Sequence, residues 1–325
     1  MSVAEEIVAS VREEGLLTPG RPVLVMLSGG RDSTCLLDVA VTVAGTPAAS
    51  ALHVNYGLRD AAQADEQHCR SLCKRLGVEL AVTRPTRPTP ALGNVQAWAR
   101  DTRYGAAAQL ARERGADVAA GHTATDQVET ILYRLASSPS RRALLGMRPR
   151  DGALVRPLLG FTREQTGDYC IERGLEWRDD ESNETDFYAR GRVRNRLVPA
   201  LREIHPGAER NLLALAATLR DEAEVLDALV DNELGGRAEI ELRRLRELPV
   251  AVARLVVQRL ADQVGGRPTP GAARRLSDIL ALREVGTTHV DLPGGVRATA
   301  NDGLLKFSPT PGDTTRGAAD PAPDP

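Results

Sequence analysis

Short apolar runs alternate with amphipathic stretches through the first half of the chain. The apolar runs have the length and composition of strands and cover residues 23–27, 49–55, 78–82, 117–121 and 154–158. Apolar residues three or four positions apart predict helices over 3–17, 34–43, 65–76, 95–114 and 163–173. A strand, a helix and a second strand in this order form a parallel crossover unit. The pattern therefore predicts an α/β fold with a doubly wound, mostly parallel sheet.

The second half of the chain has a mainly helical pattern. Apolar residues recur at helical spacing over 209–234, and residues 242–264 and 269–282 supply two further helical segments. Residues 289–292 and 296–299, joined through Pro293-Gly294-Gly295, predict a β-hairpin. A chain of 325 residues exceeds the usual size of one core. We therefore predict a first domain over 1–186, a smaller, mainly helical domain over 187–308, and a disordered tail over 309–325.

Composition adds a few constraints. The net charge of −2 neither requires nor excludes a nucleic-acid partner. Lysine occurs only at Lys74 and Lys306, outside any motif, so an attacking amine is expected to come from a substrate. The four cysteines form no Cys-x-x-Cys pair. Without a signal peptide or a membrane-spanning apolar run, the chain is expected to be cytoplasmic, with no membrane partner.

A glycine-rich loop follows the first predicted strand. Glycines let the backbone approach an anion, and the N–H groups of the next helix point at it. The loop lacks the Gly-Lys-Ser/Thr of a Walker A motif and carries an aspartate, which would repel phosphate unless it held a cation. A metal-bridged nucleotide is therefore expected at Ser28, Gly29, Gly30, Arg31, Asp32 and Ser33. Ser-Gly-Gly-x-Asp-Ser after a strand resembles the PP-loop of ATP pyrophosphatases, although an ordinary glycine-rich turn has a similar pattern.

Polar residues also gather where other predicted strands end. His53 and Asn55 follow the second strand, and His122, Asp126 and Glu129 follow the fourth. Open parallel sheets bind their ligands at this edge. Asp126 and Glu129 are three positions apart, so they share a helix face that suits a metal ion or a cationic substrate group. The positive N-terminal end of a helix alone also favours acids there.

Arginines form further candidate sites. Arg100 and Arg103 fall within one helical turn and can face one anion, although a solvated basic face has the same spacing. Residues 134–163 are strongly basic and include predicted loops at 137–140 and 146–152. A second basic run, residues 189–199, carries no acid. It predicts either contacts with a polyanion such as RNA or a solvated linker helix. Its candidate RNA-binding residues are Arg190, Arg192, Arg194 and Arg196.

Together these stretches resemble the tRNA(Ile)-lysidine synthase family, strongly over residues 20–205 and more weakly over 209–308. The resemblance implies a ligase that forms a carbon–nitrogen bond on tRNA(Ile) with a CAU anticodon. ATP would adenylate the C2 oxygen of the wobble cytidine with release of pyrophosphate, and the ε-amine of free L-lysine would then displace AMP. The first domain would bind ATP, the second would bind tRNA, and a homodimer is compatible with the family. The additional C-terminal domain of longer members is not expected here.

The resemblance also assigns roles. Asp32 and Asp126 would hold Mg²⁺, and Arg100 or Arg103 would stabilise phosphate oxygens. Asp126 or Glu129 would bind the incoming ammonium, and His122 would handle a proton or contact the nucleotide. The chain departs from the family at Tyr56, where His is usual, and at Thr125-Asp126, where two aspartates are usual.

Three other functions share parts of this pattern. A PP-loop tRNA thiolase of the 2-thiocytidine type would need cysteines for a persulfide or an iron–sulfur cluster. An amidating synthetase for GMP or NAD would need an ammonia supply and a pocket for an acidic metabolite. A catalytically silent ATP- or RNA-binding module would bind ATP without releasing pyrophosphate.

Overall fold

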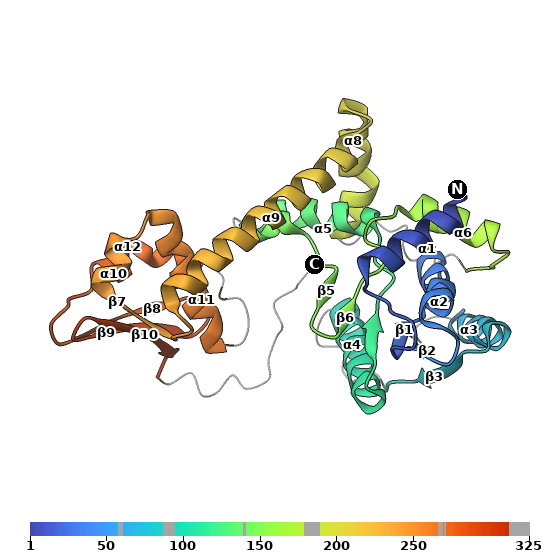
Figure 1. Ribbon diagram of the computed structural model, residues 1–325, viewed down its shortest axis with the longest axis horizontal. Coiled ribbons are helices and arrows are strands. Elements are labelled where there is room, and N and C mark those ends of the chain that lie inside the picture. The colour runs from blue at the N-terminus through green and yellow to red at the C-terminus, as the bar shows by residue number, and fades with distance from the viewer. Residues whose placement is uncertain are drawn as a thin grey trace. The chain divides into compact units, whose positions relative to one another are not determined.

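A computed structural model describes residues 1–57, 61–86, 95–138, 141–178, 189–265, 269 and 271–311 (Figure 1). The chain forms two compact units, the first ending at Ala214 and the second beginning at Leu215. The predicted boundary at 186/187 lies outside the described residues, as do Leu58 and Arg59 of the motif after the second strand and residues 312–325 of the predicted tail.

The first unit contains a six-stranded sheet in the order β3-β2-β1-β4-β6-β5. The pairs β3–β2, β2–β1, β1–β4 and β4–β6 are parallel, and β5 pairs with β6 in the antiparallel direction. The bounds are β1 Val23–Met26, β2 Ala49–Val54, β3 Glu79–Thr83, β4 Asp117–Ala119, β5 Arg150–Asp151 and β6 Leu154–Val155. The predicted parallel sheet is confirmed. The loop predicted over 146–152 is wrong at β5, because Gly152, with φ +59°, lets the chain reverse into a short hairpin with β6.

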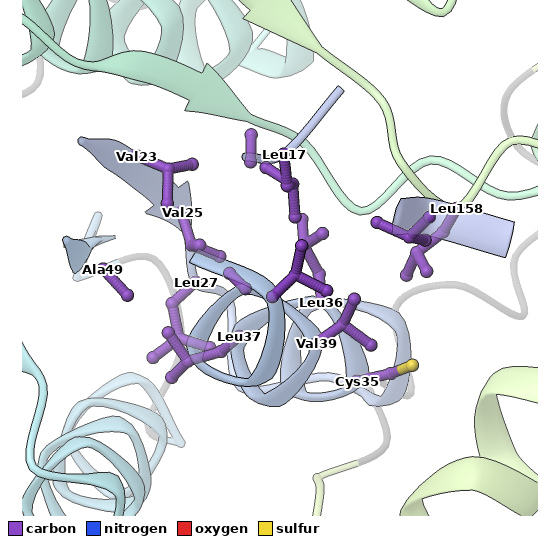
Figure 2. Close-up of a cluster of buried hydrophobic side chains, with 14 of the residues drawn as sticks. Leu17, Val23, Val25, Leu27, Cys35, Leu36, Leu37, Val39, Ala49 and Leu158 are labelled. Carbon is purple, nitrogen blue, oxygen red and sulfur yellow. The ribbon is translucent and has the colours of Figure 1, made fainter. Parts of the chain in front are cut away.

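Helices cover both faces of this sheet. Successive β1 side chains point to opposite faces, so Val23 and Val25 pack in one cluster with Leu36, while Leu24 and Met26 pack in another with Ala107. Figure 2 shows part of the first cluster, where side chains of β1 meet those of α2. The doubly wound arrangement is thereby confirmed. The helices are α1 Val3–Glu14, α2 Arg31–Ala44, α3 Ala62–Leu76, α4 Val95–Arg114, α5 Ala124–Ser137, the 3-10 helix η1 Arg141–Leu145, and α6 Arg163–Glu172.

Helix α2 begins earlier than the periodicity predicts. It starts at Arg31 rather than Thr34, with Gly30 as its N-cap, so Asp32 and Ser33 belong to its first turn. A further helical stretch after residue 188 is built from α7 Ala189–Arg192, the π-helical turn η3 Val193–Leu197, and α8 Val198–Ile204. The arginine run therefore lies on a helix, as expected.

Helix α9, Ala208–Leu234, begins in the first unit and ends in the second. The second unit contains a four-stranded antiparallel sheet in the order β7-β10-β9-β8. Its strands are β7 Glu239–Glu241, β8 Thr287–Leu292, β9 Val296–Asn301 and β10 Leu304–Pro309. The predicted hairpin is confirmed as β8 and β9, but the three-residue strand β7 and the six-residue strand β10 were missed.

The helices of the second unit differ from the prediction in one place. The segment 242–264 is two helices, α10 Leu242–Glu247 and α11 Val250–Gly265, because Pro249 cannot continue the first one. A 3-10 turn, η4 Ala272–Arg275, leads into α12 Leu276–Leu280. These helices and the sheet bury a separate core that includes Leu245, Val256, Ile279 and Leu305. Among the described residues, no helix is both long and apolar enough to cross a membrane.

Candidate nucleotide and substrate site

The loop between β1 and α2 is closed by its own hydrogen bonds. The Ser28 amide donates to Ser33 Oγ at 3.2 Å, and Ser33 Oγ donates to the Gly30 carbonyl at 2.9 Å. Gly29 has a φ of +88°, in the region that favours glycine. No side chain caps α2 at Gly30, so the first-turn N–H groups of α2 are the donors that a phosphate would meet.

Gly121 lets the end of β4 lie directly against the first turn of α2. A Cβ added at Gly121 would stand 3.2 Å from the carbonyl oxygen of Asp32 and 3.2 Å from the amide nitrogen of Ser33. These are backbone atoms, so they cannot move aside as a flexible side chain would. This glycine therefore brings the polar residues after β4 next to the phosphate loop.

Asp32 is held by two side chains of α6. Thr166 Oγ1 donates to Asp32 Oδ1 at 2.5 Å, and Arg163 Nε donates to Oδ2 at 3.1 Å. Burial raises the pKa of Asp32, while the bonds from Thr166 and Arg163 lower it and the nearby Asp126 raises it further. Sequence reasoning missed both partners. The Thr162-x-x-Gln165 capping box indicates where α6 begins. It does not indicate which distant residue the side chains of α6 contact.

The two polar residues after β2 are engaged by the protein itself. His53 Nδ1 lies 2.9 Å from the Leu27 carbonyl oxygen and 3.4 Å from Cys69 Sγ. Asn55 Nδ2 donates to Glu66 Oε2 at 2.9 Å, and its Oδ1 accepts from the Gly57 amide at 3.0 Å. The bonds to Glu66 from Asn55 and two arginines hold the pKa of Glu66 at about 2. Both side chains fix the backbone at the edge of the sheet, and nucleotide contact by either stays a prediction.

Arg100 and Arg103 flank one aromatic ring on α4. Their guanidinium carbons lie 4.9 Å and 5.7 Å from the centre of the Tyr104 ring. The Tyr104 hydroxyl is buried and has no hydrogen-bond partner among the described residues. Both arginines also interact electrostatically with His122, which places this basic group beside the residues that follow β4.

The two acids of α5, Asp126 and Glu129, have different hydrogen-bond partners. Asp126 closes a capping box, because its Oδ2 accepts from the Thr123 amide at 2.9 Å and from Thr123 Oγ1 at 2.8 Å. Glu129 is buried and accepts two hydrogen bonds from Arg194, at 2.5 Å and 2.9 Å. Arg163 bonds Asp32 and also interacts electrostatically with Asp126 and Glu129. The three predicted acids therefore lie in one neighbourhood, each with a different bonded partner.

His122 precedes this helix with its Nδ1 buried and without a partner among the described residues. Burial lowers the pKa of His122 to about 4; Asp126 raises it in part, and Arg156, Arg100 and Arg103 lower it further. The imidazole is therefore neutral near pH 7.

Comparison with known proteins agrees with this geometry. A family model described as a PP-loop domain matches residues 3–201. The tRNA(Ile)-lysidine synthase of Thermobifida fusca is 33% identical over 305 residues, covering 90% of this chain and 93% of that protein. The chain belongs to the tRNA(Ile)-lysidine synthase family.

Other members of the tRNA(Ile)-lysidine synthase family are longer. A Thermus thermophilus enzyme is 35% identical over 302 residues, covering 90% of this chain but 58% of the relative. The Symbiobacterium thermophilum enzyme is 33% identical, covering 95% of this chain and 69% of that protein. The chain thus spans less than two thirds of the Thermus relative. Among solved structures, the U34-tRNA thiolase NcsA from Methanococcus maripaludis matches with a TM-score of 0.55, at 17% identity over 67% of this chain and 78% of that one, which shows a shared fold.

Both departures from the family pattern have structural partners here. Tyr56 donates from its hydroxyl to the Ala99 carbonyl at 2.7 Å and meets the Trp98 ring edge-on, with centroids 5.7 Å apart. Thr125 Oγ1 accepts from the Arg163 amide at 3.2 Å, at the start of α6. Tyr56 therefore ties the end of β2 to α4, and Thr125 helps to position the arginine that pairs with Asp32.

The four arginines predicted to bind tRNA divide between two environments. Arg194 pairs with Glu129, and Arg190 Nη2 lies 3.5 Å from Thr130 Oγ1, so both lie against α5 beside the acids. Arg192 and Arg196 instead line a groove with more distal residues of α5. Residues four apart share a helix face, so Arg190 and Arg194 lie on one face of the helix and Arg192 and Arg196 lie on another.

Proposed function

We propose that this chain catalyses the reaction for which its relatives are named, the synthesis of lysidine on tRNA(Ile). The proposed substrates are ATP, free L-lysine and tRNA(Ile) with a CAU anticodon, and the reaction would take place in the cytoplasm. The C2 oxygen of the wobble cytidine attacks the α-phosphorus of ATP and pyrophosphate leaves. The lysine ε-amine then attacks C2 of the adenylated base, loses a proton, and AMP leaves.

One observation carries this proposal within the site. Asp32, beside the phosphate loop, bonds the guanidinium of Arg163, and Glu129 of α5 bonds that of Arg194. Asp126, three positions before Glu129 on α5, interacts electrostatically with Asp32. Three acids that already face cations next to a nucleotide loop suit a reaction that brings together a phosphate-bound cation and a substrate ammonium.

The donor set fits Mg²⁺ as a partner of ATP. Among the described residues, no group of three or more His, Cys, Asp or Glu side chains could hold a metal. Mg²⁺, however, commonly binds one or two carboxylates and takes its other ligands from phosphates and water. Asp32 and Asp126 supply that pair, and the bound ion would neutralise phosphate charge. Because Arg163 now bonds Asp32, ion binding implies that this guanidinium gives up its place.

The remaining residues have roles that follow from their positions. The first-turn N–H groups of α2 bind phosphate oxygens, and Arg100 and Arg103 stabilise negative charge that develops on the phosphate oxygens. Glu129 orients the lysine ammonium when Asp126 holds Mg²⁺, and Asp126 is the alternative for this role. His122, neutral because burial lowers its pKa to about 4, accepts a hydrogen bond rather than supplying positive charge.

The cysteines argue against thiolation. Cys35, Cys69, Cys73 and Cys170 are all buried. Burial raises the pKa of Cys69 and of Cys73 to about 12 and also raises the pKa of Cys35. Persulfide chemistry needs an accessible thiolate, whereas all four thiols are buried and those of Cys35, Cys69 and Cys73 stay protonated near neutral pH. A homodimer remains a prediction.

The decisive experiment incubates the chain with labelled L-lysine, ATP, Mg²⁺ and the cognate tRNA. We expect label in the RNA, with AMP and pyrophosphate formed in equal amounts. A transcript with uridine in place of the wobble cytidine is the matched control and should take up no label. ATP binding without pyrophosphate release would instead indicate a silent module, and sulfur transfer to the tRNA would indicate a thiolase.

A further inference from the structure

An open groove of about 600 Å³ separates α5 from the helix formed by α7, η3 and α8. Leu132 and Tyr133 of α5 line it, together with Val193, Leu197, Arg192 and Arg196 of the second helix. Its volume falls within the range of small-ligand pockets. None of the predicted ATP-binding or catalytic residues lines it, so the groove is separate from the nucleotide site.

The apolar lining of the groove rests on a small core. Val128, Leu132, Val193 and Val198 form one buried cluster, with Tyr133 packed against it. Leu197, however, is 40% exposed although it lines the groove. A preformed apolar surface of this kind favours a flat, apolar ligand group.

Two arginines give the groove a preference for a ligand with negative charge. Arg190 and Arg194 lie against Thr130 and Glu129, and the exposed residues Arg192 and Arg196 line the groove. An aromatic side chain combined with guanidinium groups is the combination that binds single-stranded nucleic acid, with the base on the ring and the phosphates on the cations.

The groove also lies close enough to the acids of α5 for one RNA strand to reach both. Glu129 and Tyr133 are four residues apart on α5, which corresponds to about 6 Å along the helix axis. Stacked nucleotides are about 3.4 Å apart along a strand, and unstacked neighbours span more. The lysine ammonium proposed to lie at Glu129 attacks the reacting base, so a nucleotide adjacent to that base can reach Tyr133.

We propose that this groove binds an unstacked nucleotide of the RNA substrate, next to the reacting cytidine, with its base against Tyr133 and its phosphate at Arg192 and Arg196. The proposal rests on the proposed function for the identity of the RNA. It adds a subsite that draws a neighbouring base out of the stack and so leaves the reacting base accessible.

Photocrosslinking tests this placement directly. The full chain is mixed with the tRNA carrying 5-iodouridine on the 5′ side of the reacting cytidine, or 8-azidoadenosine in place of the adenosine on its 3′ side. The mixture is irradiated, and the crosslinked peptide is identified by mass spectrometry. We expect one of the two RNAs to crosslink to Tyr133 or another groove residue. A crosslink found only elsewhere in the chain would overturn the proposal.

Kinetics give a second readout. Tyr133→Ala should raise the KM for tRNA about tenfold, which matches the loss of one base–aromatic stack, and Tyr133→Phe should restore it. Leu135→Ala, at an exposed α5 residue outside the groove, and Arg112→Ala, at an exposed arginine of α4, are the controls and should leave the KM unchanged. A KM for Tyr133→Ala equal to that of the controls would contradict the subsite.

The outcomes separate this subsite from the proposed function. A groove crosslink without lysine transfer would keep the subsite and remove the activity. Lysine transfer without a groove crosslink would keep the activity and remove the subsite. If sedimentation instead shows a dimer that Tyr133→Ala dissociates, and no crosslink forms, the groove binds a second copy of the chain and the proposal is wrong.

Discussion

Asp32 combines burial with two strong hydrogen-bond donors. The pKa of Asp32 is raised overall, chiefly by burial, while the bonds from Thr166 and Arg163 to its two oxygens lower it in part. A carboxyl group that is already held by hydrogen bonds at the start of α2 is positioned for a cation without reorganisation of the backbone.

Removing the charge of Asp32 should therefore affect chemistry more than folding. Asp32→Asn keeps the size of the side chain and can still accept the bond from Thr166. We expect pyrophosphate release to fall by at least about a hundredfold, the scale for losing one electrostatic group at a reacting centre. Pyrophosphate assays and thermal melting on the same samples check this; a melting temperature that falls as steeply as the activity would mean that Asp32 is mainly structural.

His122 gives the stability a dependence on pH. Its pKa is about 4 in the folded chain and 6.5 in the unfolded one, so the unfolded state binds more protons between these values. The contribution of His122 is therefore present above pH 6.5 and is lost as the pH falls toward 4. The charged groups that interact with it are Asp126, Arg156, Arg100 and Arg103.

His122→Asn should flatten this dependence. We expect the free energy of unfolding of the unsubstituted chain to fall by up to about 1 kcal/mol per pH unit below about pH 6.5, and that of the variant to fall less. Urea unfolding between about pH 5 and about pH 7.5 measures both. His289→Asn, at an exposed residue of β8, is the control; parallel curves for all three proteins would contradict the assignment.

At the scale of the element, the helix from α7 to α8 serves two surfaces. Arg194 forms a paired hydrogen bond with Glu129, whose side chain is 4% exposed, whereas Arg196 lines the groove. Removing one partner of a buried ion pair leaves a buried charge without compensation. Arg196 is exposed, so water weakens the interactions that its charge makes. The two arginines on either side of Asn195 thus have different energetic roles.

Alanine substitutions should separate these roles. Arg194→Ala is expected to lower the free energy of unfolding by about 3 kcal/mol, and adding Glu129→Gln should restore part of it. Arg196→Ala should cost less than about 1 kcal/mol and reduce the salt dependence of tRNA binding by about one phosphate contact. Urea unfolding and tRNA titrations over a range of salt concentrations test this; equal destabilisation by both substitutions would contradict the division.

At the scale of the whole molecule, each unit has a core of its own. The first core joins β1 with α1 and α2, and the second joins α10, α11 and α12 with the antiparallel sheet. The phosphate loop belongs to the first unit alone. Ligand binding stabilises the state that binds, so ATP should act on the first unit.

Leu305→Ala tests this separation, because Leu305 is fully buried in the second core. We expect it to destabilise the second unit by about 2–5 kcal/mol and to leave ATP affinity unchanged. Hydrogen exchange followed by mass spectrometry should show faster exchange in β8, β9 and β10 only, and slower exchange in α2 when ATP and Mg²⁺ are added. Faster exchange throughout both units would show that they unfold together.

Local pattern was enough to predict the parallel sheet, most of its helices and the phosphate loop. Period-two and helical spacing, glycines and capping residues act over a few positions and are visible in the chain itself. The same spacing missed β5 and β7, because strands of two or three residues carry too little alternation to be detected. It also missed β10, where the adjacent Leu304 and Leu305 break the alternation.

Tertiary structure decided which groups meet. Asp32 pairs with Arg163 across 131 positions, and Glu129 pairs with Arg194 across 65. No local pattern encodes such contacts, because sheet order and crossover handedness bring distant segments together. The sequence by itself determined that a nucleotide loop and a set of acids exist. Only the fold paired Asp32 with Arg163 and Glu129 with Arg194, and placed Arg192 and Arg196 along a separate groove.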